Sequence, residues 1–229
     1  EPGNFAQEFQ PQPALQVPSE AQCGSGNGKF QQQQQGEKRE QGGDRAQTLA
    51  GQSQFAAQIE QARTGFESWR QRSADERAAI LDRAASDMDR SRYELAAWEV
   101  FEVGKPWREA DADVAEAIDF LRFYGAEMRR LSKPARLGNR PGEMNHRVYA
   151  PRGIAAVIAP WNFPLAIPAG MVSAALATGN CVLFKPSERS PRMGQLLTDI
   201  LISAGIPSGV LCCLPGGPDI GQALVAHPR

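Results

Sequence analysis

Downstream of residue 50, hydrophobic positions recur at spacings of three and four residues, which is the period of an α-helix. Ser73 followed by Glu76 has the pattern of a capping box and predicts the start of a second helix. Gly104 predicts the end of a third helix, because glycine readily adopts the left-handed conformation found past helix C-termini. We therefore predict a helical segment over residues 51–133. The first apolar stripe consists of Phe55, Ile59, Ala62, Phe66 and Trp69.

Beyond residue 133 the periodicity changes twice. Residues 134–150 are punctuated by glycine and proline, and Met144 to Tyr149 alternate between polar and apolar, which predicts a strand segment outside the main core and available for oligomerisation. In residues 151–229, apolar runs alternate with helical patterns. Such strands need cover on both faces, so we predict an α/β fold with a doubly wound parallel sheet. The expected order is strand Ile154 to Ile158, helix Leu165 to Ala177, strand Cys181 to Phe184, helix Met193 to Ala204, strand Val210 to Leu214 and helix Asp219 to Ala226.

Residues 1–50 have a different composition, rich in Gln, Gly, Pro and Glu, with five consecutive glutamines at 31–35. A segment with so few aliphatic side chains cannot bury enough apolar surface to offset its ordering entropy. We predict a disordered or extended N-terminal arm. A role as an interaction tail is a weaker alternative.

Charge and hydropathy exclude several classes of function. The net charge of −1 is spread along the chain, so no electrostatic footprint for nucleic acid or an anionic membrane is present. No apolar stretch reaches the roughly 20 residues of a membrane span, and the N-terminus lacks the pattern of a secretory signal. We expect a soluble, cytoplasmic protein with no nucleic-acid partner and no membrane span.

The four cysteines, Cys23, Cys181, Cys212 and Cys213, form no Cys-x-x-Cys pair, and no histidine stands at ligand spacing from them. We therefore predict no metal site. Three of these cysteines lie in apolar strand-like runs, where cysteine usually behaves as a small buried hydrophobe. The two histidines receive no catalytic role, because neither has a nucleophile and an acid nearby in a triad-like pattern.

Polar side chains follow the first two predicted strands. Because parallel strands deliver their C-terminal ends to one edge of a sheet, these side chains are expected to form one site. The amide of Asn162 can hold a developing oxyanion, a donor whose removal typically costs about 2.7–4 kcal/mol in the transition state. Lys185 and Glu188 can bind ribose hydroxyls. From the residues alone three alternatives stay open: Asn162 as a turn residue, Lys185 as a solvated cation, and Glu188 as a helix N-terminal carboxylate.

The segment from Ala159 to Pro191 closely resembles the aldehyde dehydrogenase superfamily, with Pro-Trp-Asn-Phe-Pro at 160–164 and Lys-Pro-Ser-Glu at 185–188. The resemblance implies that Asn162 forms half of an oxyanion hole and that Phe163 is a wall of the substrate tunnel. It also implies NAD as the cofactor, favoured over NADP because the carboxylate of Glu188 would repel a 2′-phosphate. The cofactor-binding positions carried over are Ile158, Pro160, Trp161, Lys185, Ser187, Glu188, Gly217 and Gly221.

Residues 101–120 and the pair Gly170-Met171 are similar to the glutamate-semialdehyde (1-pyrroline-5-carboxylate) dehydrogenase branch of that superfamily. This implies oxidation of L-glutamate γ-semialdehyde to L-glutamate in proline or arginine catabolism, a homo-oligomer when full length, and a fused or separate proline dehydrogenase as partner. The family's nucleophilic cysteine and general base are expected beyond Arg229, so we interpret the chain as an N-terminal part, truncated within its βαβαβα NAD-binding portion and inactive alone. The alternatives are an aldehyde dehydrogenase of another substrate class and a non-catalytic nucleotide-binding or assembly module.

Overall fold

The computed structural model describes residues 55–227. The predictions for the N-terminal arm and for Cys23 lie outside the described residues. Among the helices described, none is both long enough and apolar enough to cross a membrane.

The first half of the described chain is helical, as predicted. A helix covers residues 55–69, and the capping box of Ser73 and Glu76 opens the next one, with each side chain bonded to the backbone N–H of the other residue. The third ends at Gly104 in the left-handed conformation, with φ 69°. The labelled helices are α2 (Ala74–Arg90), α3 (Arg92–Val103) and α4 (Trp107–Leu131).

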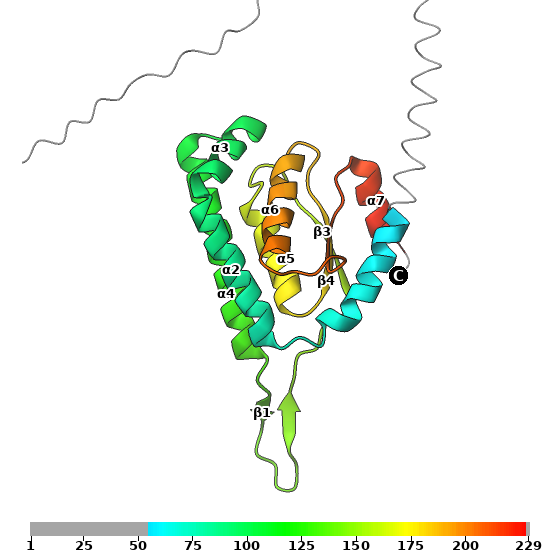
Figure 1. Cartoon of the computed structure of the whole chain (residues 1–229). Coiled ribbons are helices and arrows are strands. Elements are labelled where there is room, and N and C mark those ends of the chain that lie inside the picture. The colour runs from blue at the N-terminus through cyan, green and yellow to red at the C-terminus, as the bar shows by residue number, and fades with distance from the viewer. Residues whose placement is uncertain (1–54, 228–229) are drawn as a thin grey trace, which may run out of the picture. The chain divides into compact units, whose positions relative to one another are not determined.

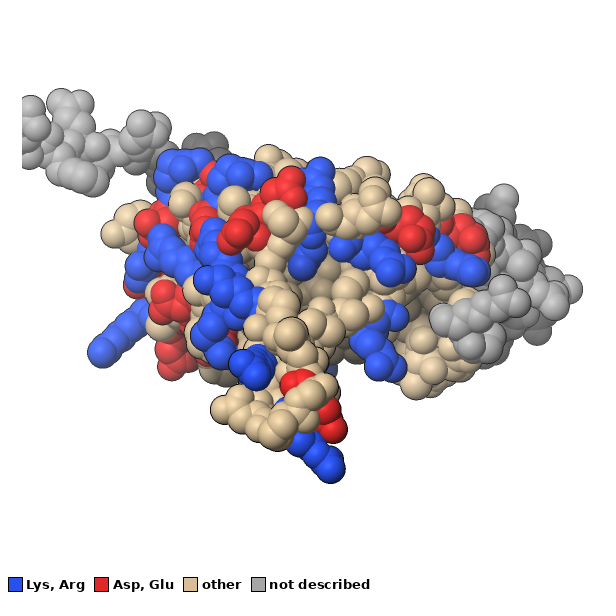
Figure 2. All heavy atoms as spheres, turned by 90° about the horizontal axis from the view of Figure 1, so that it is seen from below, with Lys and Arg blue, Asp and Glu red and all other residues tan. Residues whose placement is uncertain are grey.

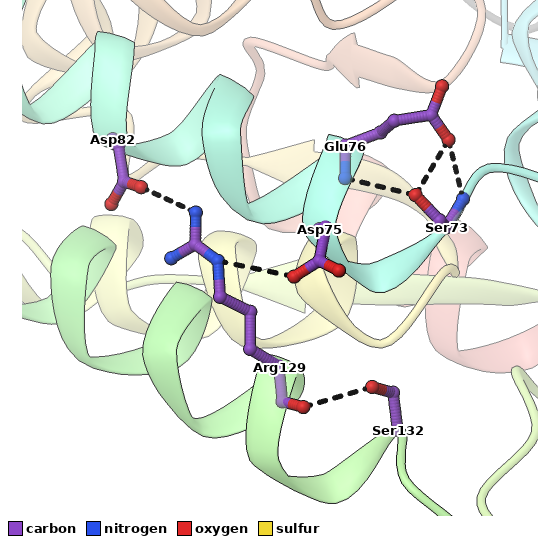
Figure 3. Close-up of polar contacts among 6 residues, drawn as sticks. All are labelled: Ser73, Asp75, Glu76, Asp82, Arg129 and Ser132. Carbon is purple, nitrogen blue, oxygen red and sulfur yellow. Dashed lines mark hydrogen bonds and ion pairs between the residues drawn. The ribbon is translucent and has the colours of Figure 1, made fainter.

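Helices α2 and α4 pack side by side through their apolar stripes, burying Leu81 and Met88 of α2 and Leu121 of α4. At the rim of this contact, Arg129 of α4 reaches two carboxylates of α2: its Nη2 lies 2.7 Å from Asp82 and its Nε 3.5 Å from Asp75 (Figure 3). These pairs are partly exposed to solvent, so we expect them to contribute little to stability compared with the apolar contact.

The second half forms a parallel sheet of three strands in the described residues, in the order β3 (Ile154–Ile158), β4 (Cys181–Lys185) and β5 (Leu211–Cys213). The predicted strands are confirmed to within one residue at each end. The central strand β4 is buried along its whole length, as expected for an apolar strand with a neighbour on each side. The crossover helices are α5 (Ala166–Ala177) and α6 (Pro191–Ser203), and α7 (Pro218–Ala226) follows β5.

Helices cover both faces of this sheet, which confirms the doubly wound architecture (Figure 1). Helices α5 and α6 lie on one face, beneath α2 and α4. On the other face, Ile59 of the first helix and Leu224 of α7 line a small cavity with Ile154, Ala156 and Leu183 of the sheet. Cover on this face is incomplete at β3, where Ala156 and Ile158 are exposed.

A hairpin of β1 (Ala135–Leu137) and β2 (Asn145–Arg147) projects from this body (Figure 1). The predicted strand within 134–150 is therefore present. Every residue of β2 is exposed, and on the face from which the hairpin projects, basic and acidic side chains are interspersed rather than gathered in one patch (Figure 2). Its use in oligomerisation stays a prediction.

Gly194 of α6 is required by its contact with the loop after β4. A Cβ at this position would lie 2.5 Å from Cβ of Pro186, so we expect Gly194→Ala to destabilise the chain by about 1–3 kcal/mol in urea denaturation. The matched control is Gly125→Ala within α4, where the new methyl would meet Ala78 at an ordinary 3.5 Å. That variant should be neutral or gain up to about 1 kcal/mol from helix propensity. Equal effects of the two substitutions would contradict the packing argument.

Candidate functional site

Three loops meet at the C-terminal edge of the sheet, as parallel topology predicts. The backbone N–H of Ala159, just past β3, donates to the carbonyl of Lys185 at 3.2 Å, and the N–H of Leu214, just past β5, donates to that of Phe184 at 2.7 Å. The guanidinium of Arg189 lies 5.2 Å from the centre of the Trp161 ring and joins the first loop to the second. The expected assembly of the loops is therefore present, and the roles of their residues stay predictions.

Lys185 is buried at the end of β4, with 4% of its surface exposed, so the alternative of a solvated loop cation is wrong. Its ammonium donates to the carbonyl of Pro186 at 3.0 Å and lies 3.6 Å from a carboxylate oxygen of Glu188. Its stem runs past Gly221 of α7, where a Cβ would stand 3.6 Å from Cδ. The stem of this buried lysine therefore lies in ordinary van der Waals range of α7, the helix that follows the third loop.

Three more of the predicted cofactor residues lie at the ends of the strands or in the loops that follow them. Ile158 pairs with Lys185 in the parallel register, so both side chains point to the α7 face, and Ile158 is 41% exposed there. Ser187 is buried and its hydroxyl accepts a hydrogen bond from the N–H of Arg189. Gly217 is the N-cap of α7.

Glu188 is more than half exposed. Its own backbone N–H, followed by the charge of Lys185, holds the pKa of its carboxyl below the ordinary value. Glu188 is thus an anion at neutral pH, available to accept hydrogen bonds from hydroxyl groups.

The first loop presents Pro160, Trp161, Asn162 and Phe163, all exposed. The Asn162 side chain forms no hydrogen bond with the rest of the described chain, which gives no support to the alternative of a turn residue bonded to its own backbone. Its amide is therefore available as a hydrogen-bond donor.

Carboxylates from the helical segment cap the two helices that cross over between the strands. Asp113 of α4 accepts a hydrogen bond from the N–H of Ala166, the first residue of α5, at 2.9 Å. Glu102 of α3 accepts from the N–H groups of Arg192 and Met193 in the first turn of α6, at 2.7 and 2.9 Å. Negative charge at a helix N-terminus is favourable, so these contacts lock the sheet's helices to the helical segment.

A buried cluster of charged side chains lies beneath the Asn162 loop, and the sequence analysis did not predict it. The ammonium of Lys105 is 2.8 Å from Asp113 and 3.6 Å from Glu99, and it stands 4.1 Å from the centre of the Phe163 ring. Burial, then the adjacent carboxyl of Asp113, raises the pKa of Glu99 to about 9, and Lys105 offsets this only in part. Glu99 is therefore neutral at pH 7, and Lys105 and Asp113 form the ion pair.

Helical spacing held a signal for two members of this cluster. Glu99 follows Leu95 and Ala96 at four and three residues, on the apolar face of α3, and Asp113 falls between the core residues Ala110 and Ala117 of α4. An acidic residue on an apolar face indicates a buried polar contact.

The cysteines within residues 55–227 are unsuited to nucleophilic catalysis. Burial raises the pKa of Cys181 to about 12 and also raises the pKa of Cys212 and Cys213. Because the thiolate is the reactive species, these side chains act as small hydrophobes, as the sequence predicted.

The chain belongs to the aldehyde dehydrogenase family, whose sequence model matches residues 44–229. Among named relatives, the chain is 50% identical over 165 residues to the 1-pyrroline-5-carboxylate dehydrogenase of Geobacillus thermodenitrificans (strain NG80-2), which covers 72% of this chain and 32% of that protein. It is 45% identical over 172 residues to 1-pyrroline-5-carboxylate dehydrogenase 2 of Bacillus subtilis (strain 168), covering 75% and 33%. The chain thus spans about a third of the length of these relatives.

Solved structures agree with this assignment. A 1-pyrroline-5-carboxylate dehydrogenase from Thermus with bound NAD matches with a TM-score of 0.75 and 42% identity, covering 78% of this chain and 35% of that one. Proline utilization A from Bdellovibrio bacteriovorus, inactivated by N-propargylglycine, matches with a TM-score of 0.75 and 47% identity, covering 76% and 18%.

The raised pKa of Glu99 predicts a pH-dependent cost of folding. Between pH about 4.5 and about 9 the folded state keeps a proton on Glu99 that the unfolded state has lost, so this group makes stability fall as pH rises through that window. Glu99→Gln removes the cost, and its stability relative to the wild type should increase with pH by up to about 1.4 kcal/mol per unit. Urea denaturation of the chain between pH 5 and pH 8 measures the difference. Glu94→Gln, an exposed change on the same helix, is the control; a pH-independent difference for Glu99→Gln would refute the raised pKa.

Proposed function

We propose that this chain is the N-terminal part of an NAD-dependent aldehyde dehydrogenase that oxidises L-glutamate γ-semialdehyde to L-glutamate. The observation that carries the proposal is the buried Lys185, paired with Glu188 and set against Gly221, at the edge where the neighbouring loop presents a free Asn162 amide. Family membership and the names of the relatives support the choice of reaction.

The residues at this edge fit the adenosine half of NAD. An ammonium carries three donors, and that of Lys185 makes one hydrogen bond at 3.0 Å and one longer ion pair at 3.6 Å, so a buried donor has capacity for a ribose hydroxyl. Glu188 supplies the acceptor for such a hydroxyl. We assign the adenine side to Gly217 and Gly221 together with the exposed Ile158, and further contacts to Pro160, Trp161 and Ser187. When bound, NAD supplies the acceptor for the hydride that leaves the substrate carbon.

Asn162 acts on the substrate oxygen in this proposal. When a cysteine thiolate adds to the aldehyde carbon, the carbonyl oxygen becomes an oxyanion, and the amide of Asn162 donates a hydrogen bond to it. Phe163 forms a wall of the substrate tunnel. We propose that the thiolate and the general base come from sequence outside these 229 residues, since the described cysteines are buried or partly buried and have raised pKa values. Residues 1–229 alone then oxidise no aldehyde.

The setting that we propose is cytoplasmic catabolism of proline or arginine. The similarity to proline utilization A supports a proline dehydrogenase, fused or separate, as the partner. A homo-oligomer is proposed from the β1–β2 hairpin, because an exposed two-stranded hairpin is marginally stable unless another surface covers it.

In the complete enzyme with glutamate semialdehyde as substrate, Asn162→Ala should slow the first-turnover formation of NADH by about 10²-fold to 10³-fold, with little change in the dissociation constant of NAD. The reason is that the amide acts on charge that develops only in the transition state. Rapid-mixing kinetics and a binding titration measure the two quantities. An unchanged rate constant in a folded variant would show that Asn162 does not stabilise the oxyanion.

The anionic Glu188 predicts a preference for NAD over NADP. A carboxylate accepts hydrogen bonds from ribose hydroxyls and repels a 2′-phosphate, so Glu188→Gln should narrow the ratio of kcat/KM for NAD to that for NADP, mainly by improving NADP use. Glu143→Gln, the same change in the projecting hairpin, is the control and should leave the ratio unchanged. A wild-type enzyme that uses both cofactors equally would show that Glu188 does not face the ribose.

A further inference from the structure

Lys105 is placed to act on the loop that carries Asn162. It lies in the connection between α3 and α4 and is 8% exposed. Its ammonium is held by Asp113 at 2.8 Å and faces the Phe163 ring, whose centre is 4.1 Å away. A cation at this distance over an aromatic face is attracted by the ring, and more strongly where water is excluded.

Asp113 holds the same loop at a second point. One oxygen of its carboxylate takes the ammonium of Lys105, and the other accepts the N–H of Ala166. The stretch from Phe163 to Ala166 is therefore fixed at both ends by one ion pair, and Pro164 and Leu165 between them are buried. Asn162 is the residue directly before this fixed stretch.

Glu99, the third member of the cluster, does not compete with Asp113 for the ammonium of Lys105. Glu99 is fully buried, and its carboxyl oxygens have no hydrogen-bond partner in the described chain. Held in its neutral form by the raised pKa, it adds no second negative charge that would draw Lys105 away from the ring.

We propose that Lys105, anchored by Asp113, is a positioning residue that fixes the Phe163 ring and thereby holds the Asn162 amide in its oxyanion-binding position. The inference rests on the proposed function, because it assumes that Asn162 donates to the substrate oxygen. Stability alone is a poor explanation for the cluster, since a buried ion pair is often no more stabilising than apolar side chains of similar volume. The contacts of Lys105 with Asp113 and with the Phe163 ring instead fix the orientation of that ring.

The test is a double-mutant cycle in the complete enzyme. Lys105→Met keeps the length of the stem and removes the charge, and it is measured with Asn162 intact and with Asn162→Ala. We expect Lys105→Met to slow first-turnover NADH formation by about 10-fold or more while the NAD dissociation constant stays within about 2-fold, because small misplacement of a catalytic group is costly. In the Asn162→Ala background the same substitution should slow the reaction by less than about 3-fold, since the group that it positions is gone. Lys105→Arg, which retains the charge, should restore most of the rate.

The outcomes of this cycle test the positioning role of Lys105 separately from the proposed function. Equal factors in the two backgrounds would overturn the positioning role and leave the proposed function standing. No effect of Asn162→Ala on its own would instead overturn the proposed function. Should Lys105→Met fail to fold, Phe163→Leu examines the other side of the contact while leaving the Lys105–Asp113 pair in place. Its loss of rate should likewise shrink in the Asn162→Ala background, and equal factors there would also refute the positioning role.

Discussion

The carboxylate of Asp113 is the contact on which the arrangement of this chain depends. It joins helix α4 to the connection just before it, through Lys105, and to the start of α5, 53 residues further along the chain, through the N–H of Ala166. Removing one partner of a buried ion pair leaves an uncompensated charge, which costs about 3–5 kcal/mol. The position of the first loop at the sheet edge is thus set by the helical segment as well as by β3.

A similar contact links the same segment to the second loop. Glu102 of α3 caps α6, and α6 in turn packs through Gly194 on Pro186, next to Lys185. The helices that precede the sheet therefore do more than cover its outer layer. They carry the carboxylates that fix where the two crossover helices begin, and each crossover helix begins directly behind a loop of the candidate site.

The sequence was a good guide wherever periodicity decides structure. The strands follow from short apolar runs, the capping box from Ser73 and Glu76, and the helix end from Gly104, because each is governed by neighbours within a few residues. Parallel topology then predicts that the loops after the strands meet. The burial of Lys185 and the surroundings of the Lys105–Asp113 pair could not be predicted in this way, because both involve neighbours distant in sequence: α7 with Gly221 beside Lys185, and Phe163 with Ala166 beside the pair.

The central claim is that the edge formed by Lys185 and Glu188 binds the adenosine ribose of NAD. The most direct measurement is a crystal structure of the complete protein with NAD bound. We expect the ribose hydroxyls to lie within about 2.7–3.2 Å of the ammonium of Lys185 and the carboxylate of Glu188. An adenosine bound elsewhere, with Lys185 still contacting only Pro186 and Glu188, would contradict the account.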